Sequence, residues 1–556
     1  MTRARIVVAV ARAFVLAFGV VSLWLTRDAL NPDGIAYLDA SDVYLAGGWP
    51  ASGSGYWSPL YPTLLAIGRK IGGTAVAREQ TIAQVVNLAI YVLAFAALEW
   101  LIRAMRENRA LSPGVEPNDT TWRVLAYALF GWAMVGWIQP SFITPDLLVA
   151  TIGLGIAACC VRLTTRRAGW GLAAVLGALL ALGYLAKAAM FPIAIVVLAV
   201  LAFVLRRQHG LARVALAGIV FLGLSAPQIA YVSRLKGAPT FGDVGRLNYL
   251  WFVADVPGPV SSSFALPASL PTHEGVHQRL TALAGGRREP AVYDIDAPIP
   301  GTLPIWYDAG YWYRGVSAPL KIKPVIRAGV RHARVYFEML GFLLVGGVAA
   351  VLVGGVSRRA FLEMRPSAVL VVPALAAFAM YGLVLVQTRY VAPFALLLFA
   401  GLVPPRATDE LSRRLRTGFA AGAILALPLV MHLVRVERLF WYNAARDRTA
   451  VVTDLAAKGV PAGARLGYVG EAYDALWARA GRFRFVSVVP SAEADRFWAL
   501  SEAERSRILT HMRERGAVAV VAEAPVMGIN VTGWEDLPPA GKPKPSLIVW
   551  TGGREP

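Results

Sequence analysis

The sequence predicts an all-α polytopic membrane protein of about eleven transmembrane helices, followed by a small C-terminal α/β extracytoplasmic domain. Three observations support this fold class. Hydrophobic residues make up 56% of the 556-residue chain and charged residues only 16%, whereas charged residues make up about 25% of a typical soluble domain. Apolar runs long enough to cross a bilayer recur throughout residues 1–434. After residue 435 the pattern changes to short apolar strands between amphipathic helices.

The expected spans alternate across the membrane, starting from a basic N-terminus that we place in the cytoplasm. Loops predicted to be cytoplasmic carry clusters of arginines, as the positive-inside rule expects, while "PSFITPD" and "QTRYVAP" hold one arginine between them. We therefore expect a multi-pass protein of the inner or plasma membrane, with an uncleaved first helix. The expected spans cover residues 6–25, 80–102, 122–139, 147–161, 170–185, 190–205, 211–232, 333–353, 366–385, 391–403 and 418–434.

The formal net charge of +20 comes from 55 Lys and Arg against 35 Asp and Glu. Since the arginines cluster between apolar runs, we interpret this charge as a consequence of topology and expect no nucleic-acid partner. The only cysteines, Cys159 and Cys160, are adjacent within an apolar run and imply no disulfide framework.

Three parts of the chain are expected to be extracytoplasmic: the loops 26–79 and 233–332, and the C-terminal region. In that region "RLGYVG", "FRFVSVV", "AVAVVAE" and "SLIVW" are typical of short buried strands, and "AYDALWARA" and "EADRFWALSEAERSRILTHMRERG" of helices. The sequence therefore predicts a transmembrane domain over residues 1–434 and an extracytoplasmic α/β domain over residues 435–556, whose role stays open.

Four ionisable residues lie at membrane ends on the predicted external side, where burial near lipid is costly and tends to mark function. Each alone has a structural interpretation: "NPD" suits a helix start, and a cation can anchor a helix end. Their convergence from four separate loops on one membrane face favours a reaction site. These residues are Asp33, Asp146, Lys187 and Arg389.

Two cations and two carboxylates suit the transfer of a sugar from a polyprenyl monophosphate. Breaking the glycosidic bond releases a phosphate, which Lys187 and Arg389 would stabilise. A positioned carboxylate would take the proton of the acceptor hydroxyl, an effect of about 10²–10⁴-fold. We predict Asp33 as this base, with Asp146 orienting the acceptor or sharing the role. The reaction requires no nucleotide and no cofactor, and we assign no metal ligand.

Five motifs resemble, in order, those of the GT-C superfamily of membrane glycosyltransferases. The similarity is strongest to the branch of protein O-mannosyltransferases and lipid A aminoarabinose transferases. It covers most of residues 1–400. The motifs are "PDGIAYLDASDVYLAGGW", "YWSPLYPTLLAI", "TPDLLVA", "LGYLAKAAMFP" and "TRYVAPF".

This resemblance implies a GT-C-like fold and a catalytic role for Asp33, with Asp146 as the second acidic residue. It implies carrier-phosphate contacts for Lys187 and Arg389. The expected activity is a hexosyl or pentosyl transfer, mannosyltransferase-like, from a polyprenyl-phosphate sugar to an extracytoplasmic acceptor in the cell envelope: a glycan, a lipid or a protein. The expected partners are that donor, that acceptor and the lipid bilayer.

Further site candidates surround these motifs. Tyr37 follows Asp33 by one helical turn on the same side, whereas Asp39 points elsewhere on that helix and is expected to be solvated. Trp57 and Tyr390 are candidate substrate-binding residues within two of the motifs. His332, at the external entry to the eighth span, is a secondary phosphate-contact candidate.

The chain departs from its relatives at two of the motifs. Gly34 stands where relatives often carry Glu. Residues 57–59 read "WSP" where the aminoarabinose transferases have Glu-Lys-Pro, which weighs against lipid A as the acceptor.

Two other function classes remain open. A transporter or flippase of lipid-linked saccharides predicts charges near the membrane centre and repeated halves, and neither pattern is visible. "HEGVH" fits a zinc metalloprotease through His273, Glu274 and His277, although Gly275 interrupts the helix that the motif needs. A divalent cation at "YDID" (Asp294 and Asp296) is a further alternative that nothing else in the sequence indicates.

Overall fold

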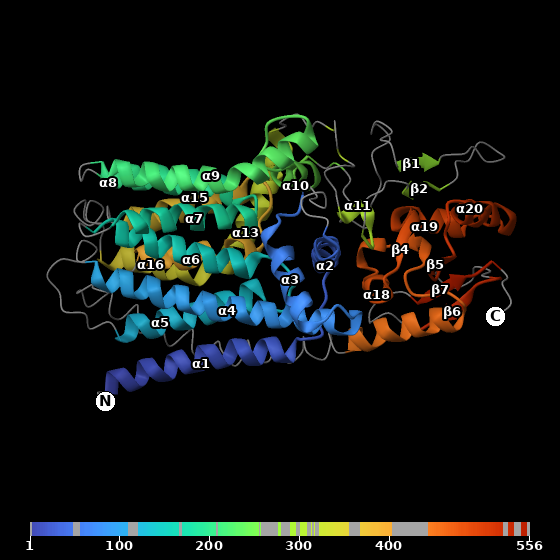
Figure 1. Ribbon diagram of the computed structural model, residues 1–556, viewed down its shortest axis with the longest axis horizontal. Helices are drawn as coiled ribbons and strands as arrows, with labels where there is room; N and C mark the ends of the chain where they lie inside the picture. The colour runs from blue at the N-terminus through green and yellow to red at the C-terminus, as the bar shows by residue number, and fades with distance from the viewer. Residues whose placement is uncertain are drawn as a thin grey trace.

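The computed structural model describes a helical bundle at one end of the molecule and a sheet-containing C-terminal region at the other, with α2 (Pro32–Leu45) and α3 (Leu60–Gly72) between them (Figure 1). The N-terminus of α1 lies at the far end of the bundle from the sheet. The structure describes residues 3–47, 56–108, 120–165, 169–206, 210–254, 256, 276–279, 290–295, 301–307, 313, 316, 322–354, 367–402, 443–525, 532–538 and 546–552.

The bundle confirms the fold class that the apolar runs predict. Apolar residues on all sides make these segments helical, because a helix satisfies its own backbone hydrogen bonds in lipid. Among the described helices, four are long and apolar enough to cross a membrane: α1, α4, α6 and α9. The bounds are α1 (Arg3–Leu25), α4 (Val76–Glu107), α6 (Asp146–Leu163), α7 (Trp170–Ala186), α8 (Met190–Leu205), α9 (Leu211–Lys236), α13 (Ile322–Gly354), α15 (Ala368–Gly382) and α16 (Thr388–Leu402).

Helix α6 is enclosed by the bundle, whereas α9 lies at its periphery. In the most apolar stretch of α6, 89% of the residues are buried, compared with only 22% in that of α9. The third expected span is a composite: α5 (Thr120–Gly131) continues as the π-helix η2 (Trp132–Ile138). The eighth begins at Ile322, well before residue 333. The last expected span, 418–434, lies outside the described residues, as does the expected domain boundary at 434.

The C-terminal region forms a mixed sheet in which all four expected strands are present. The described strands have the order β1-β2-β4-β3-β5-β7-β6, and β3 pairs in parallel with both β4 and β5. The bounds are β1 (Val276–Arg279), β2 (Val292–Ile295), β3 (Arg465–Gly470), β4 (Arg484–Pro490), β5 (Ala519–Glu523), β6 (Glu535–Leu537) and β7 (Leu547–Trp550).

Two features of this sheet differ from the expectation. Strands β1 and β2 come from the loop 233–332, and β2 pairs with β4, so the sheet joins two distant parts of the chain. The segment 493–516, which is expected to be helical, is divided at Ser501, because Ser501 caps the second helix with a capping box. The helices of this region include residues 443–457, α18 (Leu476–Ala480), α19 (Ser491–Trp498) and α20 (Glu502–Glu514), and the 3-10 turn η4 (Ala472–Asp474) precedes α18.

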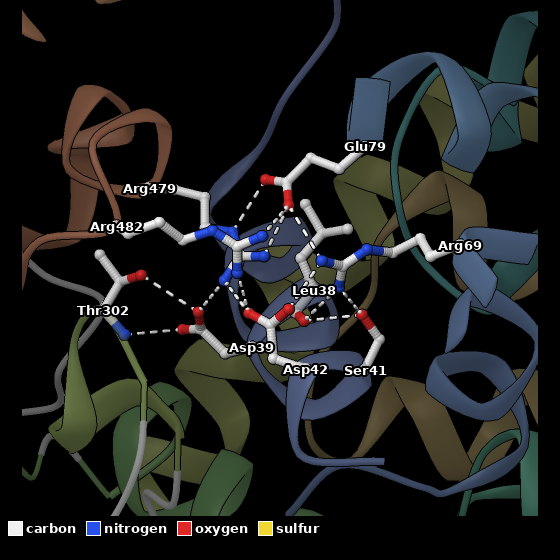
Figure 2. Close-up of polar contacts among 9 residues, drawn as sticks. All are labelled: Leu38, Asp39, Ser41, Asp42, Arg69, Glu79, Thr302, Arg479 and Arg482. Carbon is white, nitrogen blue, oxygen red and sulfur yellow. Dashed lines mark hydrogen bonds and ion pairs between the residues drawn. The ribbon is translucent and has the colours of Figure 1, made fainter. Parts of the chain in front are cut away.

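A buried cluster of charges fastens the C-terminal region to α2 (Pro32–Leu45) (Figure 2). The Arg479 guanidinium donates to both carboxylate oxygens of Glu79, at 2.9 and 2.7 Å, and to Asp39 Oδ1 and Asp42 Oδ2, each at 2.6 Å. Arg482 adds a further bond to Asp42. Arg479 is only 2% exposed. We call this set, together with Arg69 and Thr302, the Arg479 network.

Helix α3 (Leu60–Gly72) and the loop 233–332 complete the Arg479 network (Figure 2). Arg69 of α3 lies 2.7 Å from Asp42 Oδ1. Thr302 donates from its backbone N–H and its hydroxyl to Asp39, at 2.8 and 3.1 Å. The expectation that Asp39 is solvated is therefore wrong, since its side chain is 5% exposed. The three carboxylates and three guanidinium groups of the Arg479 network carry equal and opposite charge, which allows their burial.

The ion pairs of Asp42 also favour the ionised form of its carboxyl group. Burial by itself raises the pKa of this carboxyl group, but the charges and hydrogen bonds of Arg479, Arg482 and Arg69 outweigh burial. They lower the pKa of Asp42 from 3.8 to about 2. The ionised form is thus the one that holds α2 in place.

Replacing Arg479 by Ala is expected to destabilise the protein strongly. The change leaves buried carboxylates without their main partner, and removing one member of a buried ion pair typically costs about 3–5 kcal/mol. Thermal unfolding of the purified protein in detergent measures this loss. Arg496→Ala is the control, because Arg496 is 68% exposed and pairs locally with Glu493. Equal melting temperatures for the two variants would contradict the structural role of Arg479.

Replacing Asp42 by Asn should lower the melting temperature at neutral pH but have little effect near pH 2. Because the folded-state pKa of Asp42 is depressed to about 2, its stabilisation is complete above about pH 4 and is lost as the pH falls through 2. Melting temperatures of both proteins, measured from pH 7 downwards, should converge over that window. A difference that does not change with pH would show that the charge of Asp42 is irrelevant.

Candidate active site

Each of the four ionisable residues lies at a helix end, and all four ends meet at the same end of the bundle. Asp33 is in the first turn of α2, and Asp146 is the first residue of α6. Lys187 follows the last residue of α7, and Arg389 is the second residue of α16. The alternating direction of successive helices brings these ends together. The transporter hypothesis, by contrast, predicts charges near the middle of the membrane.

Two ion pairs connect these residues. Arg389 Nη2 donates to Asp33 Oδ2 at 2.8 Å, and Lys187 Nζ donates to Asp146 Oδ1 at 2.6 Å. The pairs are coupled, because Arg389 Nε also lies 3.6 Å from Asp146 Oδ2. Thr144 donates its hydroxyl to that same oxygen at 3.0 Å. The sequence-predicted quartet is therefore one contiguous set of charges with no net charge.

The packing at the start of α2 brings Asp33 near the start of α6. Pro32 at the first helical position favours the helix start. The Asn31 side chain does not cap the helix; its Oδ1 accepts from the backbone N–H of Ile143 at 3.0 Å. A Cβ on Gly34 would lie 2.9 Å from Ile143 Cβ. The absence of a side chain at Gly34, where relatives often carry Glu, thus lets α2 pack closely against the segment before α6.

The four charges line a cavity of about 270 Å³. Lys187 Nζ lies 3.4 Å from the centre of the Tyr390 ring, a cation–π contact on its wall. An aromatic wall is formed by Tyr37, Tyr56 and Trp57, whose neighbouring rings lie 4.7 to 4.8 Å apart. The rest of the wall includes the apolar residues Pro192, Phe241, Val244, Met380, Val384 and Leu385. The cavity therefore combines a charged end with an apolar body.

Burial distinguishes the two carboxylates. The Asp146 side chain is 3% exposed and is held by Lys187 and Thr144, whereas the Asp33 side chain is 17% exposed. Asp33 is thus the carboxylate more open to a second substrate. Tyr37, one turn along α2, is buried, and burial raises the pKa of its phenol well above the usual value, with the charge of Asp33 adding to the effect.

Two residues that contact Asp33 and Arg389 were not predicted from the sequence. Tyr473 of the C-terminal region lies with its hydroxyl 3.5 Å from Asp33 Oδ1. Gln387 accepts from Arg389 Nε at 2.7 Å. Gln387 lies two residues before Arg389, within the predicted external connection "QTRYVAP". No local signal marks Tyr473, which is separated from Asp33 by most of the chain.

His332 does not line this cavity. It is buried in α13, and its Nδ1 lies 2.7 Å from the carbonyl oxygen of Gly382, at the end of α15. In this position it holds two helices together. The structure therefore gives no contact between His332 and the charged quartet in the part of the chain that it describes.

Only the end of the zinc motif lies within the described residues, and there it is a strand. His273 and Glu274 lie outside the described residues, and His277 lies on strand β1, opposite Asp294 of β2. Asp294 itself is buried and accepts from Ser487 at 2.8 Å, and His511 Nε2 lies 2.6 Å from it. Asp296 lies outside the described residues. Among the described side chains, no group of three His, Cys, Asp or Glu residues could hold a metal ion.

Known structures share the arrangement of the chain. No protein-family model and no curated protein matches its sequence. The crystal structure of ArnT from Cupriavidus metallidurans in the apo state superposes with a TM-score of 0.50 at 15% identity, over 97% of this chain and 98% of that one. For ArnT bound to undecaprenyl phosphate the TM-score is 0.44 at 14% identity, over 97% of each chain.

The oligosaccharyltransferase of Archaeoglobus fulgidus, in complex with Zn and sulfate, is also similar. It matches with a TM-score of 0.48 at 14% identity, over 93% of this chain and 68% of that one. The similarity to apo ArnT extends over nearly the full length of both proteins. The chain therefore shares the fold of ArnT, which is a GT-C membrane glycosyltransferase, as the five motifs predict.

Proposed function

We propose that this protein is a membrane glycosyltransferase that moves a sugar from a polyprenyl-phosphate donor to an extracytoplasmic acceptor. The observation that carries this proposal is the pair of coupled ion pairs, Arg389–Asp33 and Lys187–Asp146, in a cavity whose wall is otherwise mainly apolar and aromatic. Cations suit a phosphate, the apolar wall suits an isoprenoid chain, and a carboxylate suits removal of the acceptor proton.

The two cations would bind the donor phosphate. As the glycosidic bond breaks, negative charge grows on the leaving phosphate, and preorganised cations stabilise it without reorganisation. Arg389 presents a planar fork of donors, whereas Lys187 acts as a point charge. Lys187 is also held against the Tyr390 ring, so its position is set before the donor arrives.

Asp33 would act as the base. The acceptor hydroxyl oxygen forms a bond to the anomeric carbon, the bond between that carbon and the phosphate oxygen breaks, and the hydroxyl proton passes to Asp33. The phosphate leaves as an anion on Arg389 and Lys187. Asp146 is more buried and already bound by Lys187 and Thr144, so we assign it to positioning the cations.

The arginine distribution supports an extracytoplasmic active site. Arg103 and Arg106 of α4 and Arg162 of α6 lie near the ends of those helices that are remote from Glu79 and Asp146. Under the positive-inside rule that end faces the cytoplasm. We therefore propose that the charged cavity and residues 435–556 face outward from the inner or plasma membrane, beyond a transmembrane domain of residues 1–434.

Replacing Asp33 by Asn should abolish turnover while the protein stays folded. The amide keeps the shape of the side chain but cannot take the acceptor proton, and loss of a general base typically costs about 10²–10⁴-fold in rate. The assay supplies radiolabelled polyprenyl-phosphate sugars to purified protein with a membrane extract as acceptor source. Asp495→Asn, on the exposed face of α19, is the matched control. Full activity of Asp33→Asn would refute the assignment of the base.

Replacing Lys187 by Ala should weaken binding of a fluorescent polyprenyl phosphate by about 10- to 100-fold, since a hydrogen bond to a charged group contributes about 1.5–3 kcal/mol. The single change also leaves Asp146 unpaired, which by itself could repel a phosphate. The double variant Lys187→Ala/Asp146→Asn separates the two effects. We expect the double variant to bind weakly too; recovery of full affinity would reject a phosphate contact by Lys187.

A further inference from the structure

A second cavity of about 430 Å³ adjoins the first, and Asp33 and Arg389 line both. The Asp33–Arg389 ion pair is therefore shared by the two cavities. The first cavity holds Lys187 and the apolar wall, whereas the described lining of the second includes neither. The proposed base thus lines two spaces, and both volumes are near or within the range of ligand sites.

The backbone of the second cavity is unusual. The π-helix η2 ends on its wall, and the next residue, Gln139, has a left-handed backbone with φ 56. Among the described residues that are not glycine, only Gln139 and Arg482 have positive φ. Such a conformation costs free energy and concentrates at functional sites, as do π-helical turns. Here it places a glutamine at the edge of a cavity beside the proposed base.

The lining of the second cavity combines hydrogen-bonding side chains with apolar and aromatic ones and carries no net charge. It includes the amides of Gln139 and Gln387, the hydroxyl of Thr388, and the aromatic rings of Trp137 and Tyr473. Amides and hydroxyls both donate and accept hydrogen bonds, and aromatic rings offer apolar faces with a polar edge. The described charged lining residues, Asp33 and Arg389, neutralise each other.

We propose that the second cavity is the acceptor site and that it takes an uncharged sugar residue, one of whose hydroxyl groups reaches Asp33. This inference rests on the proposed function. Its lining matches the neutral hydroxyl groups and apolar ring faces of a sugar. A phosphorylated headgroup would need cations beyond those assigned to the donor phosphate, and the cation of the described lining, Arg389, is assigned to that phosphate.

Tyr473 gives the C-terminal region a part in this site. Its hydroxyl lies 3.5 Å from Asp33 Oδ1, and its ring packs edge-on against Trp306 at 5.1 Å. Burial, followed by the charge of Asp33, raises the pKa of Tyr473, so the phenol stays protonated and donates. Arg479, on the helix that follows, anchors this segment to α2. Tyr473 is therefore a positioning residue that aligns Asp33 with the acceptor.

The test compares acceptors that differ only in charge. Purified full-length protein receives a radiolabelled polyprenyl-phosphate sugar together with octyl glycosides, their 6-phosphates or a Ser/Thr-containing peptide. We expect transfer to the neutral glycosides, with a KM at least tenfold lower than for the 6-phosphates. Preferred transfer to the 6-phosphates or to the peptide, or no transfer to any neutral glycoside, would overturn the inference.

Two variants probe the site itself. Gln139→Ala and Tyr473→Phe each remove one hydrogen-bonding group, which should raise the acceptor KM by about three- to tenfold, while the affinity for fluorescent polyprenyl phosphate stays unchanged. Tyr249→Phe, outside both described linings, is the control for Tyr473→Phe. An unchanged acceptor KM in both variants would overturn the inference alone. Failure of the unmodified protein to bind polyprenyl phosphate would instead overturn the proposed function.

Discussion

The position of α2 is the constraint on which the site depends, and buried charge sets that position. The N-terminal end of α2 carries Asp33, and the next turns carry Asp39 and Asp42, which Arg479 binds from the C-terminal region (Figure 2). A buried guanidinium is tolerated only with paired charges around it. The interaction that satisfies Arg479 thus also determines where the proposed base lies, and it ties the membrane bundle to the sheet at its end.

Within the site, electroneutrality decides what can bind. Lys187 and Arg389 are each neutralised by a carboxylate, so a bound phosphate would add a negative charge to a balanced cluster. Sharing the cations with that phosphate would loosen the hold of Arg389 on Asp33, which would make the carboxylate available to a hydroxyl proton in the proposed reaction. Donor binding and activation of the base would therefore be coupled through one guanidinium group. The two cavities that share Arg389 fit this order of events.

The C-terminal region is integrated with the bundle. Its sheet includes β1 and β2 from the loop 233–332, Thr302 of the same loop binds Asp39, and Tyr473 reaches Asp33. Thr302 and Tyr473 thus contact α2, and β2 joins the loop 233–332 to the sheet through β4. The C-terminal region thus places a side chain directly beside the charged quartet of the bundle.

Much of this protein is determined by local sequence. Apolar runs define most bundle helices, because a helix satisfies its own backbone hydrogen bonds in lipid, and the helix-end positions of Asp33, Asp146, Lys187 and Arg389 indicate their convergence. Gly34 marks a close approach without showing to what. Only the tertiary structure decided that Asp39 is buried and that Tyr473 reaches Asp33. It also decided that His332 joins α13 to α15 and does not line the cavity. The reason is physical: these contacts join residues far apart in the chain, and local patterning carries no information on which distant partner will satisfy a buried charge or hydroxyl.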